Sequence, residues 1–243
     1  MRIPRVHVGA ELVVGEVLAL DKAQGHYLKS VLRLKPGAAF ILFNGRDAID
    51  YRATLTFDGK KVNARIESAI PVIAESRLNS EIIQGLGRTD HTDWTIQKTT
   101  ELGVNKISLF NADRTQSPLK PAQLEKKLAH WQGVAISACE QSGRALVPAI
   151  SFYSHLQQAL AASTIEFKLL LDFDGDSLVS ILQPPRMAVS ILLGPEGGLN
   201  PTEIELAKTT GFMPVKLGPR VLRTETAATA ALAVVQTTLG DLN

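Results

Sequence analysis

The first 70 residues carry short apolar stretches separated by turn signals. Residues 39–57 hold apolar stretches bounded by Asn-Gly and Asp-Gly pairs, and residues 61–70 alternate apolar with polar side chains. Such alternation is typical of half-buried strands joined by tight turns. Residues 21–37 predict one short helical piece. We expect a small β-barrel over residues 1–70, with Pro71 at the junction that follows it.

From residue 72 onwards, apolar runs alternate with segments of helical periodicity. The two runs at 167–173 and 187–194 are apolar almost throughout, as in strands that are covered on both faces. We expect an α/β domain with a mostly parallel sheet over residues 72–243. The expected strands cover residues 80–87, 106–110, 167–173, 187–194 and 212–218.

Helix-start and helix-stop residues lie between these strands. Asn200 predicts an N-cap, with Pro201 in the first turn. Thr92 or Asp93 is expected to cap an earlier helix, and Thr224 is expected to cap the last one. The expected helices cover residues 91–104, 121–143, 200–211 and 224–240.

The composition is that of a globular protein. Of the 243 residues, 45% are apolar, which is enough for a sizeable core. We expect no membrane partner, because no window holds the ~18 uninterrupted apolar residues of a membrane span. The N-terminus lacks the apolar region of a signal peptide, so the cytoplasm is the expected compartment. Cys139 is the single cysteine, which excludes an intramolecular disulfide and a cysteine-based zinc site.

Charge is distributed unevenly along the chain. Residues 1–70 carry 11 Lys and Arg against 7 Asp and Glu, whereas the remainder carries 15 against 17. A basic N-terminal segment on a nearly neutral body is compatible with nucleic-acid docking. An ordinary solvated surface explains the same numbers.

The sequence "LLLDFDGDS" at residues 169–177 suggests a different chemistry. An apolar strand followed by Asp-x-Asp resembles the nucleophile motif of haloacid-dehalogenase-type phosphatases. That chemistry also needs a later acidic pair to hold magnesium, but the only aspartate after Asp176 is Asp241. We therefore interpret residues 172–177 as a solvated acidic loop.

Other motifs that would carry chemistry are incomplete. Residues 85–87 read Gly-Leu-Gly without the third glycine of a dinucleotide-binding loop, and no Gly-Lys-Ser/Thr of a P-loop occurs. We interpret Cys139 as a core thiol. No metal is implied, because the histidines have no ligand spacing, and we interpret them as structural or surface residues: His7, His26, His91, His130 and His155.

Two loops share the sequence Leu-Gly-Pro, and each follows an apolar run. The first contains Gly194 and Gly198, and the second begins at Gly218. In open α/β sheets ligands bind at the carboxyl ends of strands, and glycine lets a ligand approach the backbone closely. Both loops are rich in charge and enter helices with capping residues. We therefore expect them to form one shared site, whose backbone groups can bind an adenine or a ribose.

These loops also resemble a known family. The stretches "LLGPEGGL" at 192–199 and "LGPRVLRTETA" at 217–227 resemble signature motifs of the RsmE family, the 16S ribosomal RNA uridine-N3 methyltransferases of the SPOUT superfamily. Further blocks agree along nearly the whole chain: "MRIPR" at 1–5, "VLRLKPG" at 31–37, "TIQKTTELGV" at 95–104 and "ACEQSGR" at 138–144. The resemblance implies an N-terminal PUA-like barrel, a C-terminal domain with a trefoil knot, bound S-adenosylmethionine and a homodimer.

The same resemblance implies a set of site residues. Arg223 is the first candidate to stabilise charge on the uracil oxygens, and Glu196 or Glu225 would accept the N3 proton or hold Arg223. Candidate phosphate contacts are Arg2, Arg5, Arg33, Arg114 and Arg144. Candidate contacts to S-adenosylmethionine are Leu171, Leu193, Gly194, Gly198, Leu217, Gly218 and Leu222.

Methylation of uracil N3 needs no protein nucleophile, because the base nitrogen itself attacks the methyl group. Methylation at C5 needs a cysteine that attacks C6, and Cys139 on an amphipathic helix is badly placed for that role. Because N3 lies on the Watson–Crick edge, the target uridine must be unpaired or flipped out. The expected partner is 16S ribosomal RNA or the small ribosomal subunit. The alternative is a non-catalytic RNA-binding module that acts in ribosome assembly.

Overall fold

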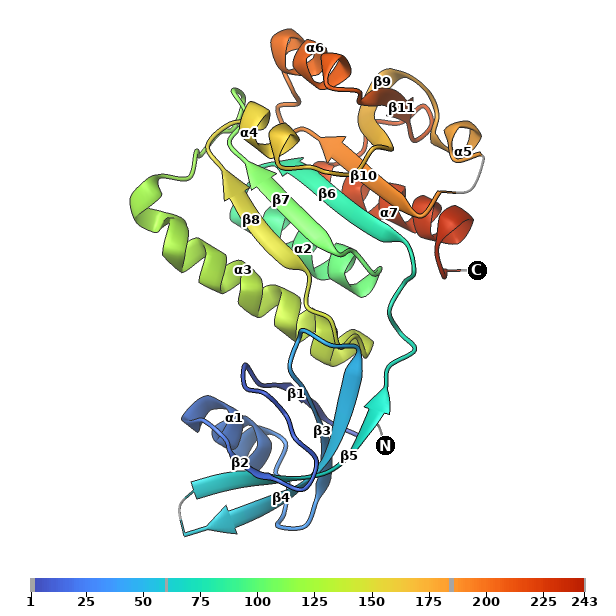
Figure 1. Cartoon of the computed structure of the whole chain (residues 1–243). Coiled ribbons are helices and arrows are strands. Elements are labelled where there is room, and N and C mark those ends of the chain that lie inside the picture. The colour runs from blue at the N-terminus through green and yellow to red at the C-terminus, as the bar shows by residue number, and fades with distance from the viewer. Residues whose placement is uncertain (1–2, 60, 184–185, 243) are drawn as a thin grey trace. The chain divides into compact units, whose positions relative to one another are not determined.

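Figure 1 presents the computed structural model of the chain, which describes residues 3–59, 61–183 and 186–242. The chain divides into two compact units. The first unit combines Met1–Glu75 with Cys139–Val147, and the second combines Ser76–Ala138 with Pro148–Asn243. A short piece of chain from the middle of the sequence thus belongs to the N-terminal unit.

The first unit contains a mixed five-stranded sheet in the order β1-β3-β4-β5-β2. Strands β1 and β3 are parallel, and the other pairs are antiparallel. The Asp-Gly turn predicted from the sequence joins β4 to β5, where Asp58 pairs with Lys61. The expected β fold of the N-terminus is confirmed as a mixed sheet, and Pro71 is the last residue of β5. Its elements are β1 (Arg5–His7), β2 (Val17–Ala19), α1 (Lys22–His26), the wider turn η1 (Tyr27–Val31), β3 (Ala39–Phe43), β4 (Ile49–Asp58) and β5 (Lys61–Pro71).

A carboxylate fixes residues 139–147 onto this unit. Oε1 of Glu75 accepts hydrogen bonds from the backbone N–H groups of Ala145 and Leu146, each at 2.8 Å. Oε2 of Glu75 accepts hydrogen bonds from Nε and Nη2 of Arg144 at 3.0 Å. Arg144 is buried, and a buried charge needs a partner. The carboxylate of Glu75, itself only 11% exposed, supplies it.

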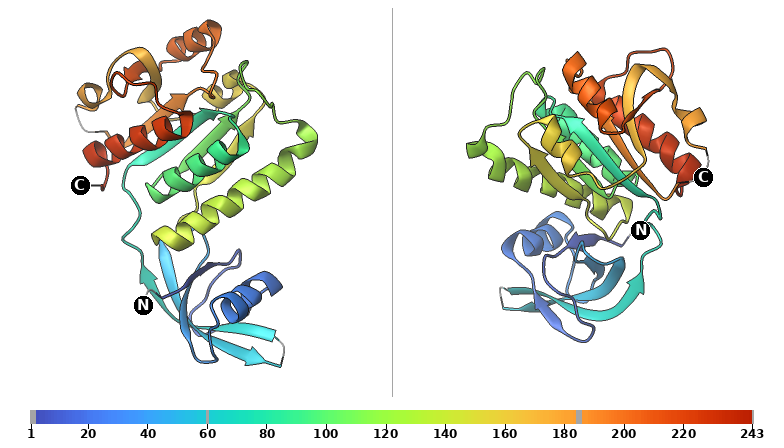
Figure 2. Two further views of the ribbon diagram at one scale, coloured as in Figure 1. Left: turned by 180° about the vertical axis from the view of Figure 1, so that it is seen from behind. Right: turned by 45° about the horizontal axis from the view of Figure 1, so that its top comes forward.

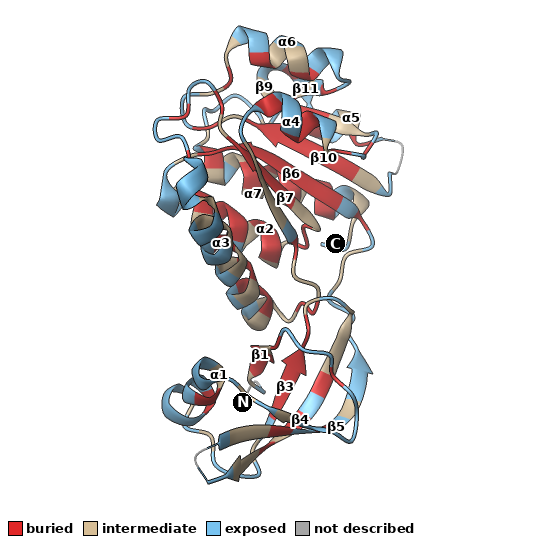
Figure 3. Ribbon diagram, turned by 60° about the vertical axis from the view of Figure 1, so that its left-hand side comes forward, coloured by how far each residue is buried: buried red, intermediate tan, exposed pale blue. Residues whose placement is uncertain are grey.

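The second unit contains a six-stranded sheet in the order β11-β9-β10-β6-β7-β8, and all its pairs are parallel. Strands β6 and β10 are buried along almost their whole length (Figure 3). The expected parallel α/β sheet is thereby confirmed. The strands are β6 (Asn79–Gly85), β7 (Lys106–Phe110), β8 (Ala149–Tyr153), β9 (Lys168–Ser177), β10 (Ala188–Leu193) and β11 (Met213–Lys216).

Helices cover both faces of this sheet (Figure 2). Helices α2 and α7 pack against each other on one face, and α4 and α6 bury their apolar residues with Ile83, Leu170 and Leu192 on the other. None of the described helices has the length and apolar composition that crossing a membrane requires. The helices are α2 (Thr89–Glu101), α3 (Pro121–Ser142), α4 (Leu156–Ala161), α5 (Leu178–Ile181), α6 (Pro201–Thr209) and α7 (Thr224–Leu239).

Two of the three expected helix starts are wrong. The capping box at Asn200 and Glu203 forms as expected. Helix α2, however, begins at Thr89 after the N-cap residue Arg88, so Thr92 lies inside the helix. There the Thr92 hydroxyl donates to the Gly87 carbonyl at 3.4 Å. Helix α7 likewise begins at Thr224 itself, after Arg223.

The acidic segment 172–177 is not a loop, contrary to the expectation from its polarity. It extends β9, and Asp176 pairs with Val215 of β11 across an irregularity in register. Gly175 is the residue that permits this approach, because a Cβ atom there would overlap the backbone of Pro214 and Val215. The sequence gives little indication of a strand here, because an exposed strand needs no run of apolar residues and four of these six residues are exposed.

We predict that Gly175→Ala lowers the free energy of unfolding by about 1–3 kcal/mol, because the added methyl group overpacks the β9–β11 contact. Chemical denaturation at neutral pH measures this change. Gly133→Ala is the matched control: a Cβ at Gly133 in α3 meets nothing within 4 Å. That control should be neutral or stabilise the protein by roughly 0.5–1 kcal/mol, because alanine favours a helix interior. Equal stabilities of Gly175→Ala and the wild type would contradict the close approach.

Candidate functional site

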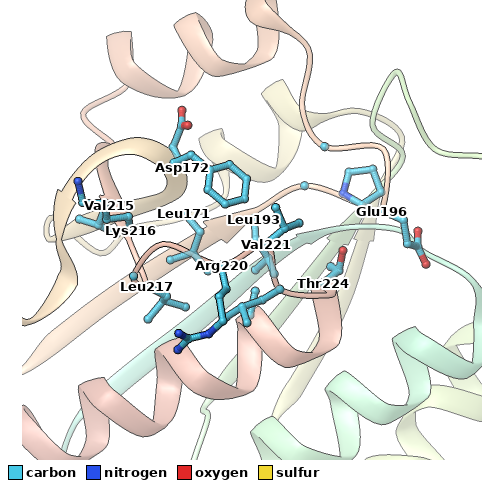
Figure 4. A pocket seen from close by; sticks show the side chains of 17 residues that line it. Leu171, Asp172, Leu193, Glu196, Val215, Lys216, Leu217, Arg220, Val221 and Thr224 are labelled. Carbon is cyan, nitrogen blue, oxygen red and sulfur yellow. The ribbon is translucent and has the colours of Figure 1, made fainter.

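A pocket opens toward the carboxyl ends of β10, β9 and the edge strand β11 of the second unit (Figure 4). Three segments line it: residues 171–173 of β9, residues 193–198 after β10, and residues 215–227, which run from β11 into α7. Strand order explains their meeting, because β9 lies between β10 and β11. Parallel neighbours end at the same edge of the sheet, where open α/β sheets bind ligands.

The structure brings all seven residues that the sequence predicted as cofactor contacts into the lining of this one pocket. Leu171 and Leu193 surround its middle in Figure 4, whereas Asp172 and Glu196 lie at its margins. Gly218 has a φ of +89° and nothing within 4 Å of a Cβ position, so its loop leaves open space. The predicted residues in the lining are Leu171, Leu193, Gly194, Gly198, Leu217, Gly218 and Leu222.

Glu196 connects the loop after β10 to the loop after β6. Its Oε1 accepts a hydrogen bond from the backbone N–H of Arg88 at 2.9 Å, and the same oxygen lies 2.8 Å from Nδ1 of His91. Gly87 makes room for this contact, because a Cβ at that position would lie 2.7 Å from the carboxylate oxygen. The two loops therefore form one continuous wall beside the pocket.

These contacts decide the charge of Glu196. Burial raises the pKa of this carboxyl group, but hydrogen bonds from the N–H of Arg88, from its own N–H and from His91 outweigh that effect. The net pKa of Glu196 is lowered from its ordinary value of 4.5. The group is thus ionised at neutral pH with its lone pairs engaged. This favours a role for Glu196 in holding Arg88 and His91, where the sequence predicted that it would hold Arg223 or accept the proton.

Glu225 completes the cluster from the first turn of α7. Its Oε2 lies 3.7 Å from Nδ1 of His91, and its side chain is only 12% exposed. This oxygen is buried without a hydrogen-bond partner among the described residues. A buried carboxylate oxygen without a partner is costly, so Glu225 has the capacity to accept a further hydrogen bond.

Arg223 occupies the N-cap position of α7, and its residue is exposed. It is near the pocket in sequence but is absent from the lining residues, which instead include Arg220 and Thr224. Figure 4 places Arg220 on the second loop, with its side chain extending over α7. The loop that the sequence singled out does line the pocket, but the arginine in the lining is Arg220 and not Arg223.

His91 and Arg88 are the residues that the sequence analysis missed. His91 was interpreted as structural or surface, although it lies between Glu196 and Glu225, with Asp90 Oδ2 3.9 Å from its Nε2. One feature of the sequence points to them, because they directly follow the expected strand 80–87, and ligands bind where such strands end. The sequence does not show which strands are neighbours. Only the strand order β10-β6 reveals that the loop after β6 lies beside the Gly-Pro-Glu loop.

Two of the expected phosphate contacts have structural roles instead. Arg5 forms an ion pair with Asp50, and its Nη2 donates to the carbonyl of Arg144 at 2.8 Å. Arg144 is held by Glu75, and the side chains of Arg5 and Arg144 are only 7% and 2% exposed. This burial argues against both as direct phosphate contacts, because their charges are paired with Asp50 and Glu75 inside the first unit.

The other three predicted arginines differ among themselves. Arg33 is exposed and has a positive φ of 52°. Arg114 is exposed, and its Nη1 donates to the carbonyls of Gly197 and Leu199 at 3.3 and 3.4 Å, close to the first glycine-rich loop. Arg2 lies outside the described residues. Arg33 and Arg114 therefore keep the exposure that a phosphate contact needs.

Cys139 is a buried core thiol, as expected. It packs with Phe43 and Ala145 in the first unit, and its Sγ donates to the carbonyl of Leu146 at 3.5 Å. Burial raises the pKa of Cys139 to about 12. A thiol that stays protonated and buried is not a nucleophile.

Two family models match this chain. A model described as an RNA methyltransferase domain matches residues 74–236, and one described as an RNA methyltransferase PUA domain matches residues 20–67.

Named relatives match over nearly the whole length. The chain is 33% identical to a ribosomal RNA small subunit methyltransferase E of Buchnera aphidicola, covering 100% of this chain and 99% of the relative. A solved ribosomal RNA small subunit methyltransferase E of Neisseria gonorrhoeae, bound to S-adenosylmethionine, is 35% identical with a TM-score of 0.91 and full coverage of both chains. A Legionella pneumophila methyltransferase with the same cofactor bound is 34% identical with a TM-score of 0.93, again over both full chains.

We predict that Glu196 titrates below its ordinary pKa of 4.5, because two N–H groups and His91 stabilise its charge. Carbon-detected NMR of the carboxyl groups, assigned with Glu196→Gln, measures the midpoint. His91→Asn should raise it, whereas His130→Asn, which alters only the pair with Asp93, should leave it unchanged. Since the folded pKa is depressed, stability from this charge is complete above pH 4.5 and is lost as the pH falls through the folded pKa. A midpoint above 4.5 would contradict the tether.

Proposed function

The chain belongs to the ribosomal RNA small subunit methyltransferase E family, and we propose that this S-adenosylmethionine-dependent enzyme methylates N3 of a uridine in 16S ribosomal RNA. Family membership rests on the RNA methyltransferase model that matches residues 74–236 and on 33% identity to a full-length relative. The target atom, the uridine and the residue roles below belong to the proposal.

The observation that carries the proposal is the pocket formed by three strand-end segments. Leucine side chains offer an apolar surface for an adenine ring, and the glycine loops offer backbone N–H and C=O groups to its edge and to the ribose. The open space at Gly198 and Gly218, both with positive φ, fits a ligand that approaches the backbone closely. When bound there, S-adenosylmethionine supplies an electrophilic methyl group.

The protein has to favour the N3 anion of uracil, which is the attacking group. Charge then develops on the uracil O2 and O4 atoms, where donors aimed at these oxygens lower the barrier. Arg223 is our candidate donor, because it is exposed at the N-terminus of α7 and carries a permanent positive charge.

The two carboxylates divide the remaining roles. Glu196 keeps its charge and its contacts to Arg88 and His91, so it holds the two loops in place. Glu225 has an unpartnered buried oxygen and is our candidate to accept the N3 proton. Its Oε2 lies 3.7 Å from Nδ1 of His91, beyond hydrogen-bond distance, so this oxygen stays open to accept a proton.

The N-terminal unit, with its PUA family match at residues 20–67, is proposed to bind RNA. The homodimer and the knot implied by the resemblance, together with the cytoplasm as the compartment, belong to the same proposal. Light scattering of the purified protein tests the homodimer, and a mass of about 26.3 kDa would exclude it.

The decisive experiment identifies the methylated atom. The protein is incubated with S-adenosylmethionine and 16S ribosomal RNA or small subunits from cells that lack its gene, and the RNA is digested to nucleosides for mass spectrometry. We expect one N3-methyluridine, whose position follows from mass mapping. A 2′-O-methylated or C5-methylated product would overturn the N3 assignment. Absence of both methyl transfer and cofactor binding would favour the non-catalytic RNA-binding module.

Cys139→Ala is the matched variant for this experiment. It removes a thiol whose pKa is about 12. Because this thiol is buried, the stability of the variant is measured alongside its activity. We expect full methyl transfer per folded molecule, because attack by N3 needs no cysteine nucleophile. Loss of transfer in the folded variant would indicate thiol chemistry.

A second prediction separates cofactor binding from chemistry. Ala227→Leu fills the pocket wall and should raise the Kd of S-adenosylmethionine about 5- to 150-fold, since overpacking costs ~1–3 kcal/mol. Arg223→Ala should leave that Kd unchanged but lower kcat about 100-fold, as expected for one lost donor to a developing oxyanion. Calorimetry and single-turnover assays measure the two quantities.

Thr226→Leu is the control for the pocket variant. Thr226 neighbours Ala227 on α7 but is exposed and absent from the pocket lining, so its affinity for S-adenosylmethionine should be that of the wild type. If both leucine variants bind the cofactor equally well, the pocket is misassigned. Wild-type turnover in Arg223→Ala would remove Arg223 from the mechanism.

A further inference from the structure

We propose that a second, cationic groove beside the pocket binds backbone phosphates of the single-stranded RNA that flanks the target uridine. The groove is a separate cavity of the second unit, lined by the loop after β6, the segment before α3 and α3 itself. This inference rests on the proposed function, because it assigns the path of the same RNA substrate. The residues that carry it are Arg88, Ser117, Lys120, Gln123, Lys127 and Trp131.

The charge of the groove is complementary to phosphate. Three cations, Arg88, Lys120 and Lys127, belong to its described lining, against Asp90 as the single carboxylate there. Arg88 and Asp90 form an ion pair at 3.5 Å, but both side chains are about two-thirds exposed at 65% and 64%. An exposed pair of this kind contributes little, so Arg88 is free to turn toward a phosphate.

Lys127 and Trp131 also line the groove. Nζ of Lys127 donates to Oγ1 of Thr89 at 3.1 Å, which keeps this ammonium at the groove near the start of α2. Trp131 is 1% exposed, and its indole N–H has no hydrogen-bond partner among the described residues. Trp131 thus lines the groove while its N–H is closed off from solvent.

The groove and the pocket share one wall. The backbone N–H of Arg88 donates to Glu196, a residue of the pocket lining, at 2.9 Å, while Arg88 also belongs to the groove lining. The segment from Gly87 to His91 therefore separates the two cavities. RNA whose target base meets the methyl donor at the mouth of the pocket runs along this shared segment into the groove.

Size and chemistry agree with this occupant. The groove has a volume of about 590 Å³, which is within the ~300–1,000 Å³ of small-molecule sites. Phosphate contacts position a nucleic acid without reading its sequence. Lysines and an arginine around a groove are the residues that such positioning uses, and a flipped uridine requires a fixed backbone on each side.

The test measures RNA binding by variants of the groove. Lys120→Ala and the double variant Lys120→Ala/Lys127→Ala are titrated with 16S ribosomal RNA by filter binding at several salt concentrations. For the double variant we expect the Kd to rise about tenfold at ~0.1 M salt and the slope of log K against log salt to flatten by about 1–2, since each lost phosphate contact removes ~0.7–0.9. The KM for RNA should rise in parallel.

Lys126→Ala is the matched control. Lys126 precedes Lys127 on α3 and is exposed, but it does not line the groove, so its Kd, salt slope and turnover should match the wild type. Because Lys127 also contacts Thr89, thermal unfolding of each variant is measured, and Lys120→Ala alone should still weaken binding. Wild-type Kd and slope in both groove variants, or equal losses in Lys126→Ala, would overturn the proposal.

The outcomes distinguish this inference from the proposed function. Methyl transfer by the wild type together with unimpaired RNA binding by the groove variants would refute the groove alone. A wild type that binds the RNA without methylating it would refute the proposed function, and the binding data would then decide the groove independently. Calorimetry with S-adenosylmethionine should give the same Kd for the wild type and the groove variants, because the groove lies outside the cofactor pocket.

Discussion

The carboxylate of Glu196 is the contact on which the architecture of the site depends. It joins the loop after β10 to the start of α2 through the N–H of Arg88 and through His91. This contact is possible because Gly87 leaves space that any side chain would fill. A charged tether of this kind is stronger than a neutral hydrogen bond. It fixes the segment from Gly87 to His91 against the loop after β10.

The two cavities on either side of this wall differ in chemistry. The pocket is lined largely by leucines and glycines, which suits a flat aromatic base and close backbone approach. The groove is cationic, which suits a polyanion. Under the proposed function, such a division would let the protein hold the methyl donor in an apolar environment while positioning the RNA by charge. Positioning of both reactants accounts for much of the rate enhancement that a transfer without a protein nucleophile requires.

The basic character of the N-terminal segment has two origins. Part of it is structural, since Arg5 pairs with Asp50 and contributes to the core of the first unit. Another part is exposed, as at Arg33. Formal charge therefore overstates the surface available to RNA. Arg144 likewise carries a charge that is not available to RNA, because its pairing with Glu75 fastens residues 139–147 to the first unit.

The sequence by itself predicted five of the six strands of the parallel sheet and the two Leu-Gly-Pro loops, but not β8, α4 or α5. Apolar runs predicted β6, β7, β9, β10 and β11, with residues 167–173 and 187–194 apolar almost throughout, and the Leu-Gly-Pro repeats predicted the pocket lining. Only the tertiary structure decided which loops are neighbours. The strand order β10-β6 brings His91 and Arg88 to Glu196 across more than 100 positions of sequence, and local patterns carry no information on such pairing. Burial likewise decided the roles of Arg5 and Arg144, since a charge inside a unit is compensated by partners that lie far away in the chain.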